Sequence, residues 1–272
     1  METLPLASND IKACCSALYE HDWTRLLLGD SFHPGGLPLT ERVGARLDLG
    51  PEAVLVDVAS GAGASAVHLA QHFGCTVTCL DYSAQNVTAA IARAVAAGVE
   101  GRMQFVQGDA EAAPLGAGKY DAVLCECALC TFPDKPAAAA EFYRLLRPGG
   151  KVGLSDVTRE GPLSTELNTL LAWVACIGDA RSAPEYARIL EQSGLRIRTV
   201  EPHPEALREL VQQVQTRLLA AELMAKLGKI TLPAGVSIGT AQALAKAALS
   251  AVQDGALGYV VIVAEKPDTG TR

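Results

Sequence analysis

The sequence predicts an α/β fold with a mostly parallel seven-stranded sheet and helices on both faces. Short apolar segments alternate with alanine-rich helical segments from about residue 50 to residue 200, which is the pattern of strands joined by crossover helices. The first two apolar segments are nearly continuous, as expected for strands buried on both faces. We expect the strands at Ala53–Val58, Cys75–Leu80, Met103–Gln107, Ala122–Glu126, Lys151–Ser155, Arg196–Glu201 and Leu257–Ala264.

Helices are expected between these strands, at Ala64–Phe73, Ser83–Ala97, Lys135–Leu146 and Pro184–Ser193. The last of them has a capping box, because Glu185 follows Ser182 by three residues. Residues 147–150 read Arg-Pro-Gly-Gly, which predicts that the preceding helix ends and that the chain turns into a strand.

The chain is expected to form one main domain with a cap before it. Residues 1–48 have a mostly helical pattern and would cover the carboxyl edge of the sheet, and residues 49–272 would form the main domain. Helices at Glu205–Leu227 and Ile238–Gln253 form a helical insertion at residues 203–255, ahead of the last strand. No internal repeat or low-complexity linker divides the sequence.

Composition narrows the class of protein. Of the 272 residues, 49% are hydrophobic and 19% are charged, and a mean hydropathy of +0.20 fits a globular chain. A net charge of −7 argues against a general nucleic-acid binder, which would carry a basic face. The first residues lack a basic stretch followed by an apolar one, so we expect no secretory leader, and no apolar run reaches the roughly 18 residues that a membrane helix needs. We therefore expect a cytoplasmic protein with eight reduced cysteines and no nucleic-acid or membrane partner.

A nucleotide-type loop follows the first expected strand. The strand ends in Asp57, and small residues from Ala59 to Gly63 lead into a helix, so the backbone can approach a ligand closely. This is not the dinucleotide-binding G-x-G-x-x-G pattern, because the acid precedes the glycines. Asp81 ends the second strand, where its carboxylate could accept hydrogen bonds from ribose hydroxyls. Asp109 follows the third strand, where it could bind the exocyclic amine of an adenine.

Three acids at the ends of successive strands resemble the class I S-adenosylmethionine methyltransferases over roughly residues 50–160. The resemblance implies the Rossmann-like class I fold, S-adenosyl-L-methionine as cofactor and an enzyme of class EC 2.1.1. The expected cofactor-binding positions are Asp57, Ala59, Gly61, Gly63, Asp81, Tyr82, Asp109, Ala110 and Cys125. Ala59 departs from the family, which usually has glycine there, and its methyl group would crowd the cofactor. The alternative is an unspecialised α/β sheet in which the same acids and glycines only make turns.

Three cysteines fall within six residues after the fourth strand, in the stretch CECALC that begins at Cys125. A cysteine on an apolar strand is most often a small buried hydrophobe, which is our interpretation of Cys75 and Cys79. A closed zinc site needs about four ligands on separated knuckles, so zinc is not expected here. His68 and His72 lie one helical turn apart, but without a nearby thiol we expect them on a solvated helix face.

The same region resembles the arsenite methyltransferase family up to about residue 195. The matching segments, in the family's order, are Cys127 with Pro133-Asp134-Lys135, then Ser155-Asp156-Val157, then Cys176-Ile177-Gly178. The resemblance implies that Cys127 and Cys176 are the catalytic pair and bind trivalent arsenic as thiolates. A further cysteine of the family, in a glycine-containing motif ahead of the cofactor loop, is not matched at residues 28–36. Cys14 and Cys15 are candidates for a third ligand of the metalloid.

The chemistry of such a site would be simple. Soft thiolates select soft centres such as trivalent arsenic, and their pKa must fall for them to bind. Arsenic held by thiolates keeps a lone pair that can attack the sulfonium methyl group in line, so the protein need only hold the partners about 3–3.5 Å apart. No general base is required. If arsenic changes oxidation state, a thiol reductant becomes a further partner.

Three functions stay open at this point. The first is methylation of a thiolate-bound trivalent metalloid, with arsenite as the leading candidate. The second is methylation of a small organic acceptor, such as a quinone, a sterol or a thiol metabolite, with the cysteines lining an apolar pocket. The third is a thiol-rich metal-binding or sensing protein on a degenerate methyltransferase scaffold, which Ala59 supports best. The loop Asp30–Gly36, with the polar side chain of His33, could be a lid, a wall of the acceptor pocket or an ordinary turn.

Overall fold

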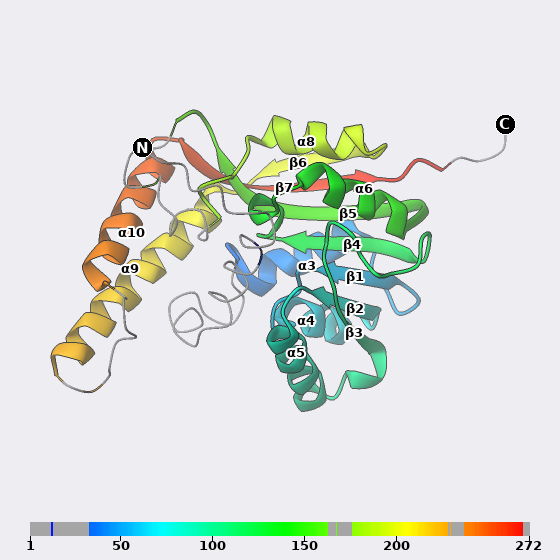
Figure 1. The fold of residues 1–272 in the computed structure, drawn as a ribbon, viewed down its shortest axis with the longest axis horizontal. Helices are drawn as coiled ribbons and strands as arrows, with labels where there is room; N and C mark the ends of the chain where they lie inside the picture. The colour runs from blue at the N-terminus through cyan, green and yellow to red at the C-terminus, as the bar shows by residue number, and fades with distance from the viewer. Residues whose placement is uncertain are drawn as a thin grey trace.

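The computed structural model describes residues 12, 33–162, 167, 176–227, 229 and 237–268. The described strands form one seven-stranded sheet in the order β3-β2-β1-β4-β5-β7-β6 (Figure 1). They are β1 (Val54–Val58), β2 (Thr76–Asp81), β3 (Met103–Gln107), β4 (Tyr120–Glu126), β5 (Leu146–Arg159), β6 (Arg196–Pro202) and β7 (Leu257–Glu265). Strand β7 is antiparallel to β5 and β6, and the other neighbouring strands are parallel. The predicted fold class is therefore confirmed.

Helices cover both faces of the sheet. They are α3 (Gly36–Arg46), α4 (Ala64–Phe73), α5 (Ala84–Ala97), α6 (Lys135–Leu145), α8 (Ala183–Gln192), α9 (Pro204–Lys226) and α10 (Ile238–Gln253), with short 3-10 helices η1 (Glu100–Arg102) and η2 (Leu129–Thr131). Leu55 of β1 packs in the core cluster with α3 and α4, whereas Val56 packs in the cluster with α6 and α8. Consecutive strand residues point to opposite faces, so β1 is buried on both. The capping box of α8 is also confirmed, since the Ser182 N–H donates to Glu185 Oε2 at 2.9 Å.

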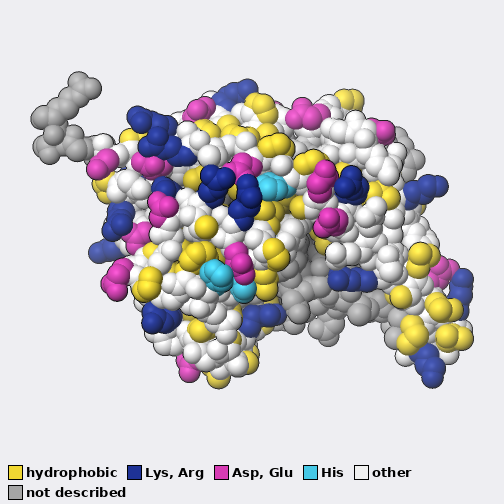
Figure 2. Space-filling model, turned by 180° about the vertical axis from the view of Figure 1, so that it is seen from behind, with side chains coloured by type: hydrophobic (Ala, Val, Ile, Leu, Met, Phe, Trp, Pro, Cys, Tyr) yellow, Lys and Arg dark blue, Asp and Glu magenta, His cyan; other side chains and the backbone are white. Residues whose placement is uncertain are grey.

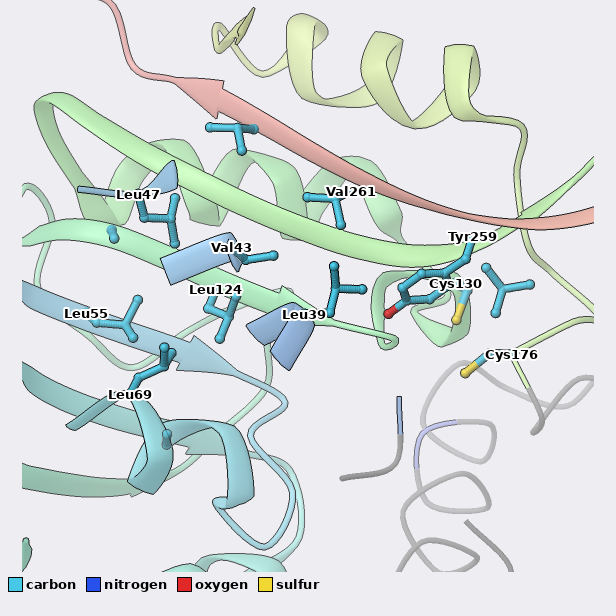
Figure 3. Close-up of a cluster of buried hydrophobic side chains, with 14 of the residues drawn as sticks. Leu39, Val43, Leu47, Leu55, Leu69, Leu124, Cys130, Cys176, Tyr259 and Val261 are labelled. Carbon is cyan, nitrogen blue, oxygen red and sulfur yellow. The ribbon is translucent and has the colours of Figure 1, made fainter. Parts of the chain in front are cut away.

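Two glycines allow α3 to pack flat on the sheet and against α4. A Cβ at Gly153 of β5 would lie 2.6 Å from Cγ1 of Val43, and a Cβ at Gly44 would lie 2.6 Å from Cε2 of Phe73. Figure 3 shows Leu39 and Val43 of α3 among the side chains of this buried cluster. Helix α3 therefore lies on a face of the sheet. Most of the remaining residues of the expected cap lie outside the described part, so the division at residue 48 stays a prediction.

The turn expected at residues 147–150 is instead the irregular first part of β5. Leu146 pairs with Tyr120 of β4 and Lys151 pairs with Ala122, so residues 147–150 bulge between two paired positions. Gly149 adopts a φ of 75° and donates its N–H to the carbonyl oxygen of Lys266 at 2.9 Å. The Pro-Gly-Gly bend is therefore held by the chain that follows β7, which sequence patterns alone do not reveal.

The helical insertion before β7 is confirmed as a pair of long helices. Helices α9 and α10 lie side by side at one end of the sheet (Figure 1). Gln215 Nε2 of α9 donates to the carbonyl oxygen of Ala245 at 3.2 Å, and Gln242 Nε2 of α10 donates to Glu222 Oε2 at 2.9 Å. Within the described ranges, no helix combines the length and the apolar character needed to span a bilayer.

Candidate active site

A cleft opens at the carboxyl ends of β1, β2, β3 and β4. It encloses about 1160 Å³ when the part open to solvent is included. The loops after the four strands line the cleft, together with Lys12, His33 and the first turn of α4. Ligands of open α/β sheets bind at this edge. The cleft thus lies where such a sheet would bind a cofactor.

The loop after β1 follows a left-handed path. Ala59, Gly61 and Gly63 have positive φ angles of 58°, 54° and 75°. A Cβ at Gly61 would have no described heavy atom outside its chain neighbours within 4 Å, so this glycine opens the backbone to the cleft. A Cβ at Gly63 would lie 2.9 Å from that of Ala90, so this glycine lets α4 start against α5. Left-handed backbone costs an alanine roughly 1 kcal/mol. The effect of Ala59 visible in the structure is therefore backbone strain, in addition to any crowding of the cofactor.

Asp57, in β1, presents an unsatisfied carboxyl oxygen in the cleft wall. The residue is 3% exposed and lines the cleft, and its Oδ2 has no hydrogen-bond partner among the described residues. Burial raises the pKa of this carboxyl group well above its usual range, and the charges of Glu126 and Asp81 raise it further. A buried polar atom without a partner is costly. A ligand that offers an N–H or O–H group would satisfy it.

Asp81 and Asp109 are both engaged by the protein itself. Asp81 Oδ2 accepts the N–H of Gly61 at 2.8 Å, and its Oδ1 accepts that of Ser83 at 2.9 Å. Asp81 therefore ties the cofactor loop to β2. Asp109 Oδ2 accepts a hydrogen bond from Lys12 Nζ at 2.7 Å, a contact that the sequence did not predict. The ribose and adenine contacts expected of these two acids stay predictions.

Four polar side chains meet beside the end of β4, and we call them the polar cluster: His33, Thr40, Ser65 and Glu126. Ser65 Oγ donates to Glu126 Oε2 at 2.6 Å, and Thr40 Oγ1 donates to the same oxygen at 3.1 Å. His33 Nε2 lies 3.4 Å from this oxygen, and the side chains of His33 and Glu126 are 6% and 5% exposed. His33, Ser65 and Glu126 line the cleft. A buried carboxylate held by two hydroxyl groups thus lies beside an imidazole at the cleft wall.

Three thiols form a second group, the thiol cluster: Cys127, Cys130 and Cys176. The Cys176 thiol interacts with those of both Cys127 and Cys130, and its Sγ also donates to the carbonyl oxygen of Cys127 at 3.2 Å. Figure 3 shows the sulfur atoms of Cys130 and Cys176 turned toward each other. Cys127 and Cys176 have φ angles of 51° and 64°, which are uncommon for residues other than glycine. The structure brings Cys127 and Cys176 together, whereas their chemical role stays a prediction.

The environment of Cys127 and Cys130 favours neutral thiols. The hydrogen bond that the Cys127 thiol makes with Cys176, followed by burial, raises the pKa of Cys127 well above its usual range, and burial raises that of Cys130. Cys130 and Cys176 are 1% and 2% exposed, and Cys127 is the member of the cluster that lines the cleft. Asp156 accepts the N–H of Cys130 at 2.8 Å, and burial, followed by the Cys176 charge, raises the pKa of Asp156 to about 7. Cys127 and Cys130 therefore favour the protonated form, beside a carboxyl group whose pKa is also raised.

Most of the expected cofactor-binding residues line the cleft, namely Asp57, Ala59, Gly61, Asp81, Tyr82, Asp109 and Ala110. Gly63 is packed against α5 instead, and Cys125 is fully buried in the core cluster that contains α6. Cys14 and Cys15 lie outside the described residues. Sequence reasoning missed the role of Glu126. The available signal was its charge, which stands alone in the apolar stretch CECALC.

Known proteins share this architecture. Residues 56–154 match the model of a family described as a methyltransferase domain. Phosphoethanolamine N-methyltransferase 2 of Haemonchus contortus, solved with phosphomonomethylethanolamine and S-adenosylhomocysteine, superposes with a TM-score of 0.78 at 19% identity, over 96% of this chain and 60% of that one. The fold is that of a class I methyltransferase. Geranyl diphosphate C-methyltransferase of Streptomyces coelicolor has the same fold, with a TM-score of 0.74 at 17% identity, over 94% of this chain and 98% of that one.

Relatives found by sequence share the same domain. Methyltransferase GfsG of Streptomyces halstedii is 28% identical over 169 residues, which are 61% of this chain and 61% of that protein. Phosphoethanolamine N-methyltransferase 3 of Arabidopsis thaliana is 24% identical over 184 residues, which are 67% of this chain and 34% of that protein. The chain thus spans less than two thirds of the length of either relative. These relatives support the resemblance to class I methyltransferases, and none of them is an arsenite methyltransferase.

Proposed function

We propose that this chain transfers the methyl group of S-adenosylmethionine to a small organic acceptor, a reaction of class EC 2.1.1. The observation that carries the proposal is the polar cluster, because it places an imidazole and a carboxylate at the wall of a cleft that also contains the cofactor loop. The match to a methyltransferase domain supports the reaction type. Relatives named for phosphoethanolamine and geranyl diphosphate support an organic acceptor.

The residues present fit S-adenosylmethionine. The cofactor offers hydroxyl and ammonium donors, and the unpartnered Oδ2 of Asp57 needs such a donor. The open backbone at Gly61 lets a ligand approach closely. Asp57, Asp81, Asp109 and the loop around Gly61 would hold the cofactor. When bound, S-adenosylmethionine supplies an electrophilic methyl group on a sulfonium sulfur, and the electron pair of the broken C–S bond stays on that sulfur.

His33 is the residue that we assign as general base. Its Nδ1 lies 3.2 Å from the carbonyl oxygen of Pro34, and we assign the tautomer protonated on Nδ1, in which Nε2 is the basic nitrogen. Nε2 lies 3.3 Å from Ser65 Oγ, which also lines the cleft. The proton of an acceptor O–H or N–H therefore moves to Nε2, directly or across the Ser65 hydroxyl, while the acceptor's electron pair forms the new bond to carbon. Glu126 then stabilises the imidazolium.

The test has two steps. Calorimetric titration with S-adenosylmethionine is expected to give saturable heat. Turnover with methyl-labelled cofactor is then measured against phosphoethanolamine, glycine derivatives, geranyl diphosphate, a mixture of cellular metabolites and arsenite. We expect the label in an organic product. Label found on arsenic alone would contradict the organic acceptor. A titration without heat would contradict methyl transfer altogether and favour a metal-binding protein on a degenerate scaffold.

A trivalent metalloid such as arsenite is the second candidate acceptor. The contact between Cys127 and Cys176, which lie 49 residues apart in the chain, is the observation that favours it. The burial of Cys176 and the raised pKa of Cys127 argue against it, because the thiols must lose their protons to bind arsenic. On this hypothesis arsenite binds stoichiometrically, and binding disappears in Cys127→Ser and in Cys176→Ser but persists in Cys75→Ser. A thiol reductant would then be a further partner.

A further inference from the structure

A separate group of ligating side chains lies outside the cleft, where α3 packs against α4. Glu41 belongs to α3, and His68 and His72 belong to α4. One carboxylate oxygen and one nitrogen from each ring all lie within 4.8 Å of one another. His68 Nε2 is 2.7 Å from Glu41 Oε1, and His72 Nδ1 is 3.7 Å from the same oxygen. The two histidines that we expected on a solvated helix face thus converge on a carboxylate of the neighbouring helix.

The backbone holds this arrangement in place. A Cβ at Gly44 would lie 2.6 Å from Phe73 Cε2 and 2.9 Å from Leu69 Cδ2, so the glycine is what lets α3 approach α4. Leu69 and Phe73 directly follow His68 and His72, so their packing fixes the side of α4 that meets α3. Residues four apart lie on one side of a helix. The two imidazole centroids are accordingly 5.9 Å apart.

The group is also accessible to ions. The side chains of Glu41, His68 and His72 are 39%, 24% and 46% exposed. Figure 2 shows histidine side chains at the molecular surface beside acidic side chains. Imidazole and carboxylate are the ligands that Zn²⁺, Cu²⁺, Ni²⁺ and Co²⁺ accept. Among the described residues, no other three His, Cys, Asp or Glu side chains converge this closely, the thiol cluster included.

We propose that Glu41, His68 and His72 bind a divalent transition-metal ion at the surface between α3 and α4. Without the ion, Glu41 pairs with the rings directly; the ion replaces these contacts with metal–ligand bonds, and water completes its coordination. Binding requires neither the cleft nor the cofactor, so it does not rest on the proposed methyl transfer. The ion joins the helix that carries Thr40 to the helix that carries Ser65, and it therefore stiffens the support of the polar cluster.

The experiment uses the tag-free full chain, stripped of metal and kept reduced. We expect Zn²⁺ to bind with a stoichiometry of one ion per chain and to raise the melting temperature of the protein by mass action. Co²⁺ is expected to give weak d–d bands without a thiolate-to-cobalt charge-transfer band. His68→Gln and His72→Gln should each weaken Zn²⁺ binding by at least about 10-fold. Losing a residue that only hydrogen-bonds to a metal ligand already lowers metal affinity by about 10-fold or more, and losing a ligand should cost at least as much.

Two further variants make the result decisive. His203→Gln is the matched control, because His203 Nε2 lies 3.8 Å from Glu201 Oε2 in a half-buried histidine–glutamate pair. The affinity of this variant for Zn²⁺ should equal that of the wild type. Glu41→Gln keeps the side-chain shape and tests the carboxylate as a ligand. Metal-free melting temperatures show that each variant is folded. Unchanged affinity in both histidine variants or in Glu41→Gln, a charge-transfer band from thiolates, or no binding at micromolar Zn²⁺ would overturn the proposal.

Discussion

The polar cluster contains Glu126 and the thiol cluster contains the next residue, Cys127, yet the two clusters have opposite physical character. Strand β4 ends at Glu126, and the positive φ of Cys127 turns the chain, so both residues reach the cleft while joining different neighbours. Glu126 is held by hydroxyl donors beside an imidazole, which is a setting for moving a proton. Cys127 contacts another thiol, that of Cys176, and lies near the buried carboxyl group of Asp156. These neighbours keep the thiol of Cys127 neutral. The chemistry of this strand end is therefore set by the neighbours of each residue and cannot be taken from its position alone.

Removing the imidazole of His33 should have the largest effect on kcat and should show which of the two clusters performs the chemistry. His33→Gln removes the proposed base, so we expect kcat to fall by about 10²–10⁴-fold. Cys127→Ser is the matched control at the same cleft wall and should keep kcat close to that of the wild type. Steady-state kinetics with an organic acceptor measure both. A large loss in Cys127→Ser with little loss in His33→Gln would shift the chemistry to the thiol cluster.

Asp156 beneath the thiol cluster should make stability depend on pH. Its pKa is raised from 3.8 to about 7 in the folded protein. Its contribution to stability is therefore fully present below pH 3.8 and is lost as pH rises through 7. Asp156→Asn removes this dependence. Between pH 5 and pH 8 the free energy of unfolding of the wild type should therefore fall by on the order of 2 kcal/mol more than that of the variant. Urea unfolding across this range measures the difference, and parallel curves for the two proteins would contradict the assignment.

Within the polar cluster, the shorter hydrogen bond should matter more. Ser65 donates to Glu126 at 2.6 Å and Thr40 at 3.1 Å. Hydrogen bonds to charged groups contribute about 1.5–3 kcal/mol. We expect Ser65→Ala to lower kcat by roughly 10-fold, at the low end of that range, and Thr40→Val to lower it less. Equal kinetics for the two variants would show that Glu126 does not depend on this support.

The smallest expected effect concerns the cofactor loop. Gly61→Ala forces an alanine into a φ of 54°, which should cost roughly 1 kcal/mol of stability. Gly255 is the control, because it has a φ of 74° and equally open surroundings but lies outside the cleft. Both substitutions should lower stability alike, whereas Gly61→Ala alone should weaken binding of S-adenosylmethionine. Thermal unfolding and calorimetric titration provide the two readouts.

Elements were predictable where local pattern determines them. The limits of α4 and α10 coincide with the prediction, and β1 to β4 differ from it by at most two residues, because periodic apolar residues and caps act over short range. The predicted start of β5 was wrong, because the bend at Gly149 is held by a hydrogen bond to Lys266, which follows β7. A local pattern carries no record of such a long-range contact.

The candidate site was predictable only in part. Acids at successive strand ends signal a cofactor edge, since parallel strands bring those ends together. The polar cluster depends instead on α3 meeting Glu126 across 86 residues, which in turn depends on the packing of Gly44 and Gly153. The positive φ angles of Cys127 and Cys176 were also beyond prediction, because tertiary packing imposes them on residues that do not favour them.

Methyl transfer under direct competition tests the central claim most directly. Wild type, His33→Gln and Cys127→Ser are each given methyl-labelled S-adenosylmethionine with an organic acceptor and arsenite in the same tube, and the label in each product is counted. We predict organic product from wild type and Cys127→Ser, and almost none from His33→Gln. Labelled arsenic from wild type and His33→Gln, lost in Cys127→Ser, would contradict the assignment of the acceptor site to the polar cluster.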